Sequence, residues 1–147
     1  MEQSMRRFMK VGLVLHAAYR GLGDGGGPIL ECLGKVVQDD YFDAVEVAHI
    51  HDPDVRRAAA GLIRTGHMVS AYGGEGRTLS AGLNLNDLDE GGRQKAVDTL
   101  KEGIDEAYEL GCAGFSFLSG RYCEETKEQS FCQLIKSTRE LCAHARD

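Results

Sequence analysis

The sequence predicts an α/β fold with one parallel sheet, built from four consecutive strand–helix repeats. Short apolar runs at residues 10–15, 44–50, 67–72 and 114–118 alternate with segments whose apolar residues recur at helical spacing. This alternation is typical of parallel strands joined by right-handed crossovers. A polar or glycine-rich loop follows each run. Ligands of such folds bind beyond the carboxyl ends of the strands, so we expect a site among these loops.

The first repeat follows a lead-in of residues 1–8 without a regular pattern. Lys10–Leu15 has no polar alternation, which predicts a strand covered on both faces. After the glycine-rich loop 21–27, Pro28 is expected to open a helix, since the missing N–H of proline costs least in the first turn of a helix. This helix is expected to end near Asp39 and Asp40. The expected buried stripe of this helix comprises Ile29, Leu30, Leu33, Val36 and Val37.

The second repeat is a strand over Ala44–Ile50 and a helix that starts at Pro53. Asp52 is suited to cap this helix, and Gly66 to end it in a left-handed conformation. Its expected apolar face comprises Val55, Ala58, Ala59, Leu62 and Ile63.

The third and fourth repeats have strands at His67–Tyr72 and Gly114–Leu118. Between them we expect polar loops over 73–77 and 78–89, then a helix capped by Asp87 or Asp89 and closed by Gly111. Glu102 and Glu106 are predicted on its solvent side. A last helix is predicted over Glu125–Ala145, with a stripe of Phe131, Leu134, Ile135, Thr138, Leu141 and Cys142.

Composition narrows the class of protein. The 147 residues carry a net charge of −6, which argues against binding to nucleic acid or to an anionic membrane. No apolar run approaches the ~20 residues of a spanning helix, and no secretory signal follows the first arginines, so a cytoplasmic protein with a single domain over 1–147 is expected. The five cysteines lack CxxC spacing, which suggests neither a disulfide framework nor a zinc site. Cys32, Cys132 and Cys142 are expected to be buried.

Two candidate sites involve the first two strand ends. The loop Gly21–Gly27 lacks the phosphate-binding patterns GxxxxGK[ST] and GxGxxG, so it is either a flexible connection or a lid. His49 and His51, with Asp52, have the spacing of a metal-binding HxH pair. Alternatively, the histidines lie at the surface or contact substrate, and Asp52 caps the helix.

Glu46 is the third candidate, because a carboxylate inside a strand is costly unless it is paired or used. Val45 and Val47 should face the helices, so Glu46 and Ala48 face the other side. In a barrel that side is the lumen, whereas in an open sheet it would be covered by helices. Glu46 thus favours a barrel, and the alternative is a structural ion pair with Lys or Arg.

The fourth candidate is the turn Ser119–Tyr122 after the last strand. A Ser-Gly turn there can hydrogen-bond a hydroxyl or phosphate, and Arg121 can pair with an anion. A plain turn with a solvated arginine is the alternative. The chain shows no nucleophile elbow and no Ser-His-Asp order.

Several segments together resemble a known family. These are KVGLVLH, FDAVEV, GHMVSAYG, LNLNDLDE before the long helix with AYELG, and FLSG. In this order and spacing they resemble the first half of the sugar phosphate isomerases/epimerases, the xylose isomerase-like TIM barrels. The resemblance runs from about Lys10 to the C-terminus and implies four of the eight βα units of a (β/α)8 barrel.

The resemblance also implies a function and a set of site residues. The family isomerises or epimerises sugars or sugar phosphates with a divalent metal, whose Glu, Asp, His and Glu ligands come from strands five to eight. The resemblance therefore implies that this chain holds no metal ligand and no cofactor, and that a divalent metal is expected if the barrel is completed. It does not identify the catalytic residues. The substrate wall that maps onto it comprises His16, Glu46, His49, Tyr72, Glu75, Ser119 and Arg121. His51 departs from what the resemblance leads us to expect at its position, which argues against a ligand role for it.

Four parallel strands with helices on one face leave the inner face and two edges open. The chain is then a fragment that needs a C-terminal half, a homodimer that closes one barrel, or an open domain whose last helix covers the bare face. Two other functions remain: a non-catalytic half-barrel that binds a ligand or assembles as a dimer, and a small phosphate-binding open-sheet domain. The latter ranks last because the first strand ends in His16 rather than Asp.

Overall fold

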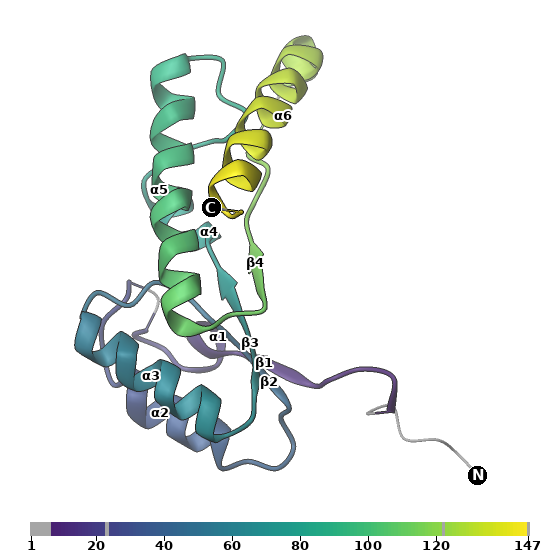
Figure 1. Cartoon of the computed structure of the whole chain (residues 1–147). Coiled ribbons are helices and arrows are strands. Elements are labelled where there is room, and N and C mark those ends of the chain that lie inside the picture. Colours follow the sequence, from purple (N-terminus) through teal and green to yellow (C-terminus); the bar gives the residue numbers. More distant parts are fainter. Residues whose placement is uncertain (1–6, 23, 122, 147) are drawn as a thin grey trace. The chain divides into compact units, whose positions relative to one another are not determined.

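A computed structural model describes residues 7–22, 24–121 and 123–146 (Figure 1). Most of the lead-in, Gly23 of the glycine-rich loop and Tyr122 lie outside the described residues. The elements are, in order, β1 Gly12–Val14, α1 Leu15–Ala18, α2 Ile29–Val37, β2 Ala44–Val47, α3 Pro53–Thr65, β3 Val69–Gly73, α4 Glu75–Ser80, α5 Glu90–Leu110, β4 Gly114–Ser116, a 3-10 turn Glu124–Thr126 and α6 Lys127–His144. Within these ranges no helix is long and apolar enough to cross a membrane.

The strands form one sheet in the order β1-β2-β3-β4. β2 pairs in parallel with both β1 and β3, and Val14, Glu46 and Ala71 lie at one level of the register. Each crossover therefore leads to the adjacent strand, as in a barrel. The prediction of four consecutive βα units with a parallel sheet is confirmed.

Two compact groups of residues make up the described chain. The sheet unit contains the residues up to Gly73 together with Ala107–Phe115, and the helical unit contains Gly74–Glu106 and the residues from Ser116 onward. That residues 1–147 form a single domain stays a prediction.

In the sheet unit, helices cover one face of the sheet only. Val45 and Val47 are each 1% exposed, whereas Ala44 and Glu46, which alternate with them along β2, are half-buried. α2 and α3 lie side by side on the buried face (Figure 1) and share its core. On β1, Val14 is 38% exposed, so the prediction that this strand is covered on both faces is wrong. An uninterrupted apolar run of this length does not specify which faces are covered.

The ends of α3 show which local signals are obeyed. Asp52 caps the helix as predicted, since its Oδ1 accepts from the N–H of Asp54 at 2.8 Å and of Val55 at 3.4 Å. Gly66 ends the helix, but its φ is −78°, and His67 takes the left-handed conformation at φ 52°. Glycine is required at 66 for a different reason, because a Cβ there would lie 2.5 Å from Cγ1 of Val37.

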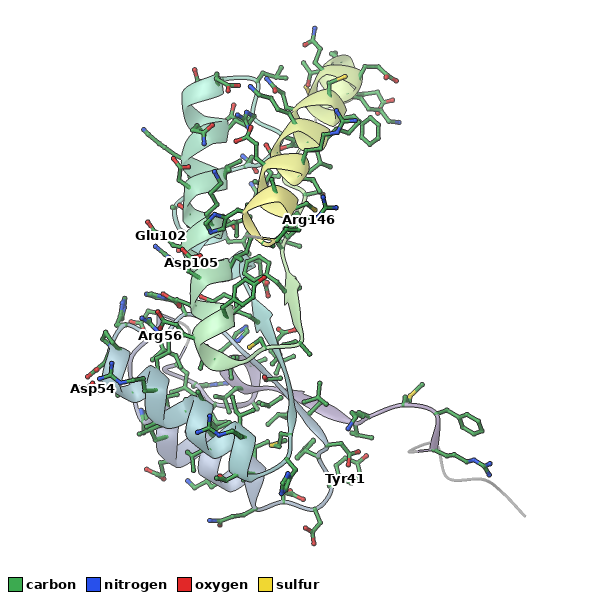
Figure 2. All side chains as sticks on the ribbon, viewed as in Figure 1. Tyr41, Asp54, Arg56, Glu102, Asp105 and Arg146 are labelled. Atoms are coloured by element: carbon green, nitrogen blue, oxygen red, sulfur yellow. The ribbon has the colours of Figure 1, made fainter. Side chains whose placement is uncertain are left out.

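Arg56 on α3 connects the helix to the preceding strand and to α5 (Figure 2). Its Nη1 donates to the carbonyl of Ile50 at 2.9 Å, and its Nε bonds Glu109. The carboxyl end of β2 is thereby fixed to the helix that follows it.

In the helical unit, three predictions are wrong. Residues 75–80 form the short helix α4 rather than a loop. Glu106 is buried rather than on the solvent side of α5. The predicted stripe of α6 is confirmed at Leu141 but is wrong at Phe131, which is 58% exposed, and the other buried side chains of this helix are Ser130 and Ser137. Ser137 is buried because it accepts from Arg93 and donates to the carbonyl of Leu85.

The cysteines divide by exposure. Cys32 is buried on α2 as predicted, but Cys132 and Cys142 are exposed, so the prediction that they are buried is wrong. Both of these cysteines lie on α6 at positions that are exposed to solvent. Cys112 is half-buried, and burial raises the pKa of its thiol.

Candidate functional site

Glu46 lies on the uncovered face of the sheet, as the alternation of β2 predicts. Its neighbours in register are Val14 of β1 and Ala71 of β3. No Lys or Arg within 7–22, 24–121 and 123–146 pairs with its carboxylate, so the structural ion pair is not found there. A carboxylate without a basic partner on this face is available to accept hydrogen bonds from a ligand.

His49 and His51 contact each other just beyond β2. Nε2 of His49 lies 3.0 Å from Nδ1 of His51, and the rings meet edge to face at 87°. One imidazole therefore donates and the other accepts. The sequence predicted either a metal-binding pair or histidines at the surface or in contact with substrate, and not this mutual hydrogen bond.

The glycine-rich loop packs on this histidine pair. The carbonyl of Gly25 accepts from the N–H of His51 at 3.0 Å. Gly25 has φ +87°, and a Cβ there would lie 2.8 Å from Cδ2 of His49. Only glycine brings the loop backbone this close to the rings. The described part of the loop thus covers the carboxyl end of β2.

His16 lies in α1 and shares a small cavity with His49. The cavity measures about 10 Å³ and is otherwise lined by apolar groups such as Leu22 and Ile29. Nδ1 of His16 is buried and has no hydrogen-bond partner among the described residues. One water fills a space of about this size, so the cavity suits a water on Nδ1 rather than a substrate.

The residues present do not fit a divalent metal. Among the described residues no group of three His, Cys, Asp or Glu side chains is placed to hold a metal ion. The ring nitrogens of His49 and His51 that face each other are occupied by their mutual hydrogen bond. A donor set of one imidazole pair falls short of the three or four protein ligands that such metals take.

Tyr72 and Glu75 lie near the end of β3 but in different settings. Tyr72 is 1% exposed and stacks on Phe115, with ring centroids 5.4 Å apart, within the apolar core. Glu75 is half-buried and begins α4, where its carbonyl accepts from the hydroxyl of Thr78 at 2.9 Å. Contact of either side chain with a substrate stays a prediction.

The turn after β4 is held by two asparagines that sequence reasoning missed. Oδ1 of Asn84 accepts from the N–H of Arg121 at 3.2 Å, and Nδ2 of Asn86 donates to the carbonyl of Arg121 at 2.8 Å. Ser119 and Gly120 line two hollows, of about 150 Å³ and about 480 Å³. The Asn-x-Asn spacing of Asn84 and Asn86 was visible in the sequence, but nothing in it indicated a partner 35 residues away.

Comparison with known proteins identifies the family. A model of the xylose isomerase-like TIM barrels matches residues 35–147, which is most of the chain. The chain belongs to the xylose isomerase-like TIM barrel family. No curated protein sequence matches it.

Two solved structures of the same fold resemble the chain. One is the crystal structure of a D-tagatose 3-epimerase-like protein, with TM-score 0.73, 18% identity and 95% of this chain covered. The other is D-psicose 3-epimerase with D-tagatose from Clostridium cellulolyticum H10, with TM-score 0.73, 19% identity and 94% covered. The chain spans 49% of each of them. The prediction of the N-terminal half of a TIM barrel is confirmed.

Proposed function

We propose that this chain forms one wall of the substrate site of a sugar isomerase or epimerase. The observation that carries the proposal is Glu46, a carboxylate on the uncovered face of the sheet with no basic partner among the described residues. In a barrel this face is the lumen, where polar groups meet the substrate. The likeness to a D-psicose 3-epimerase and to a D-tagatose 3-epimerase-like protein supports this class of reaction.

Each unit contains residues proposed to contact substrate. In the sheet unit these are His16, Glu46 and His49, with Tyr72 at the end of β3. The helical unit contributes Glu75 and the turn with Ser119 and Arg121. These groups donate and accept hydrogen bonds, which suits the hydroxyls of a sugar or sugar phosphate in carbohydrate metabolism of the cytoplasm.

The remainder of the site must come from other polypeptide. β1 and β4 are the edges of the sheet, and Val14 and Val69 are partly exposed on its bare face. Such edges and faces are normally covered. Either a C-terminal half or a second copy would do so, and a divalent metal, which these residues do not fit, would be held there.

The proposal is tested by activity and binding with the isolated chain. With divalent metal and a panel of aldoses and ketoses, the chain alone should show no turnover, and turnover would contradict the missing wall. Sugars at high millimolar concentration should shift the NMR resonances of Glu46 and His49. Glu46→Gln should reduce these shifts, whereas Glu31→Gln, on the exposed side of α2, serves as the control. If no sugar shifts them, the proposal fails.

A second candidate function is a non-catalytic half-barrel that binds a ligand or assembles as a homodimer. The partly exposed Val14 and Val69 on the bare face favour it. Light scattering coupled to size-exclusion chromatography discriminates: a compact monomer at micromolar concentration contradicts this candidate and leaves the first one standing.

A further inference from the structure

The turn Ser119–Arg121 has a backbone that only glycine allows at its centre. Gly120 has φ +104°, and a Cβ there would lie 2.2 Å from Oδ1 of Asn86 and 3.2 Å from Cβ of Asn84. Both the conformation and the contact exclude a side chain. The asparagines can therefore approach the turn as closely as they do.

Arg121 is held on both sides although it is exposed. Its N–H donates to Asn84 and its carbonyl accepts from Asn86, which is itself only 7% exposed. Oδ1 of Asn86 is buried without a donor among the described residues, which is a cost in free energy. Fixing a backbone residue costs a further ~1–2 kcal/mol. A turn that merely connects two elements does not need such a clamp, whereas a binding turn gains preorganisation from it.

A hollow of about 150 Å³ lies beside the clamped turn. Its polar lining comprises Thr78, Asn84, Ser119 and Arg121, and the rest is Gly120 with Leu79, Leu83, Leu85 and Leu118. At roughly 30 Å³ for each water, the hollow has room for about five waters, or for a compact group of five heavy atoms.

The charges around this hollow favour an anion. Among the described residues no carboxylate lines it, and Arg121 is the charged one. Arg77 and Arg93 of the same unit bond glutamates, but within the described ranges the guanidinium of Arg121 has no such partner. In a chain of net charge −6, an unpaired cation beside a hollow is an electrostatic preference for a negative ligand.

We propose that the turn Ser119–Arg121 is a phosphate subsite that binds the phosphate group of a phosphorylated sugar. The guanidinium of Arg121 and the hydroxyl of Ser119 donate to the phosphate oxygens, and Asn84 and Asn86 are positioning residues. Guanidinium forks pair with phosphate bidentately, and the remaining oxygens take the hydroxyl. The sugar part of the ligand rests on the function proposed above, and the phosphate part rests on this turn alone.

The test is an NMR titration of the full chain at constant ionic strength with inorganic phosphate, a ketohexose 6-phosphate and the free ketohexose. Both phosphates should shift the amides of Ser119, Gly120 and Arg121 and the Nε–H of Arg121. The ester should bind about tenfold more tightly than the free sugar, as one charge-assisted contact implies. Equal binding of ester and free sugar would overturn the subsite.

Matched variants separate a built site from general charge. Arg121→Met should lower the affinity for inorganic phosphate about tenfold or more. Arg139→Met removes the same charge from the exposed side of α6 and should leave that affinity within about twofold. Equal losses in the two variants would show nonspecific attraction and overturn the proposal. The amide spectrum of each variant verifies that it is folded.

The positioning role has its own readout. Asn84→Ala keeps Arg121, so the salt dependence of phosphate binding by the folded chain should be unchanged while its affinity falls. Arg121→Met should flatten that salt dependence. Unchanged affinity in Asn84→Ala would overturn the positioning role.

The two proposals fail in different ways. Phosphate binding that depends on Arg121, without sugar-induced shifts at Glu46 and His49, supports the subsite and contradicts the sugar isomerase. If sugars shift the NMR resonances of Glu46 and His49 but the sugar phosphate binds no more tightly than the free sugar, the sugar isomerase is supported and the phosphate subsite is contradicted.

Discussion

The sheet unit and the helical unit differ in what their interiors are made of. Among the described residues, the sheet unit buries aliphatic and aromatic side chains, with Ser70 as its buried polar residue. The helical unit buries six further polar side chains: Thr78, Asn86, Arg93, Glu106, Ser130 and Ser137. One unit is thus stabilised by apolar burial and the other in addition by a polar network.

Arg93 is the centre of that network. Its guanidinium, 1% exposed, donates to Ser137 at 2.9 Å and bonds Glu90 and Glu140 at 2.8 and 3.0 Å. Ser137 in turn donates to the carbonyl of Leu85 at 2.7 Å. The network joins α5, α6 and the loop before α5, and it explains why a serine rather than an apolar residue faces inward on α6.

The difference between the two units shows which buried helix faces can be predicted from the spacing of apolar residues. When a helix packs through aliphatic side chains, their spacing in the sequence predicts its buried face, as in α2. When a helix buries serine against arginine, the sequence does not predict the buried face, because serine and arginine are also common on exposed faces.

The largest expected effect is on the polar network. Arg93→Ala should destabilise the helical unit by about 3–5 kcal/mol, because it leaves Glu140 and Ser137 without their buried partner. Lys136→Met, which removes a half-exposed partner of Glu90, should cost less than about 1 kcal/mol. Urea unfolding with site-resolved hydrogen exchange measures both. If the sheet unit keeps its protection in Arg93→Ala, the two units open separately; an Arg93 cost below that of Lys136 would contradict the role of the network.

A core truncation probes the apolar interior of the sheet unit. Leu33→Ala should cost about 2–5 kcal/mol, because Leu33 is fully buried between α2 and the sheet. Leu79→Ala, at an exposed position of α4, should stay within about 0.5 kcal/mol. The same urea series compares them, and similar costs at the two positions would disprove the one-sided core.

A smaller effect is expected at the cap of α3. Asp52→Ala should cost about 1 kcal/mol, because the amides of Asp54 and Val55 lose their acceptor. Asp52→Asn keeps the acceptor and should lie within a few tenths of a kcal/mol of the parent chain. Thermal unfolding followed by circular dichroism ranks the variants. Equal losses would mean that the charge of Asp52 matters rather than its cap.

The smallest effect is a pH dependence of the polar network. Hydrogen bonds from Arg93 and Lys136 lower the pKa of Glu90 from 4.5 to about 2. Between these values the unfolded chain binds the proton first, so the contribution of Glu90 to stability is complete above about pH 4.5 and is lost as the pH falls toward about 2. In Glu90→Gln, unfolding midpoints measured over this range should fall less steeply. A slope equal to that of the parent chain would contradict the shift.

Much of the site was within reach of the sequence. The strand alternation of β2 placed Glu46 on the uncovered face, and the Asp-Pro pair placed the start of α3. The contact of His49 with His51 and the cover of Gly25 over them were not predicted, because they depend on a loop returning to the end of a strand 24 residues later. The asparagine clamp on Arg121 depends in the same way on two loops that meet only in the fold.

The sequence by itself determined the order of the four βα units, the N-terminal cap of α3 and the family. These follow from local periodicity and from motifs that act within a few residues. Tertiary structure alone decided that α6 buries serines and that Arg121 is clamped beside a hollow. A buried polar side chain is stable only when a distant partner satisfies it, and that partner is chosen by the fold rather than by neighbouring residues.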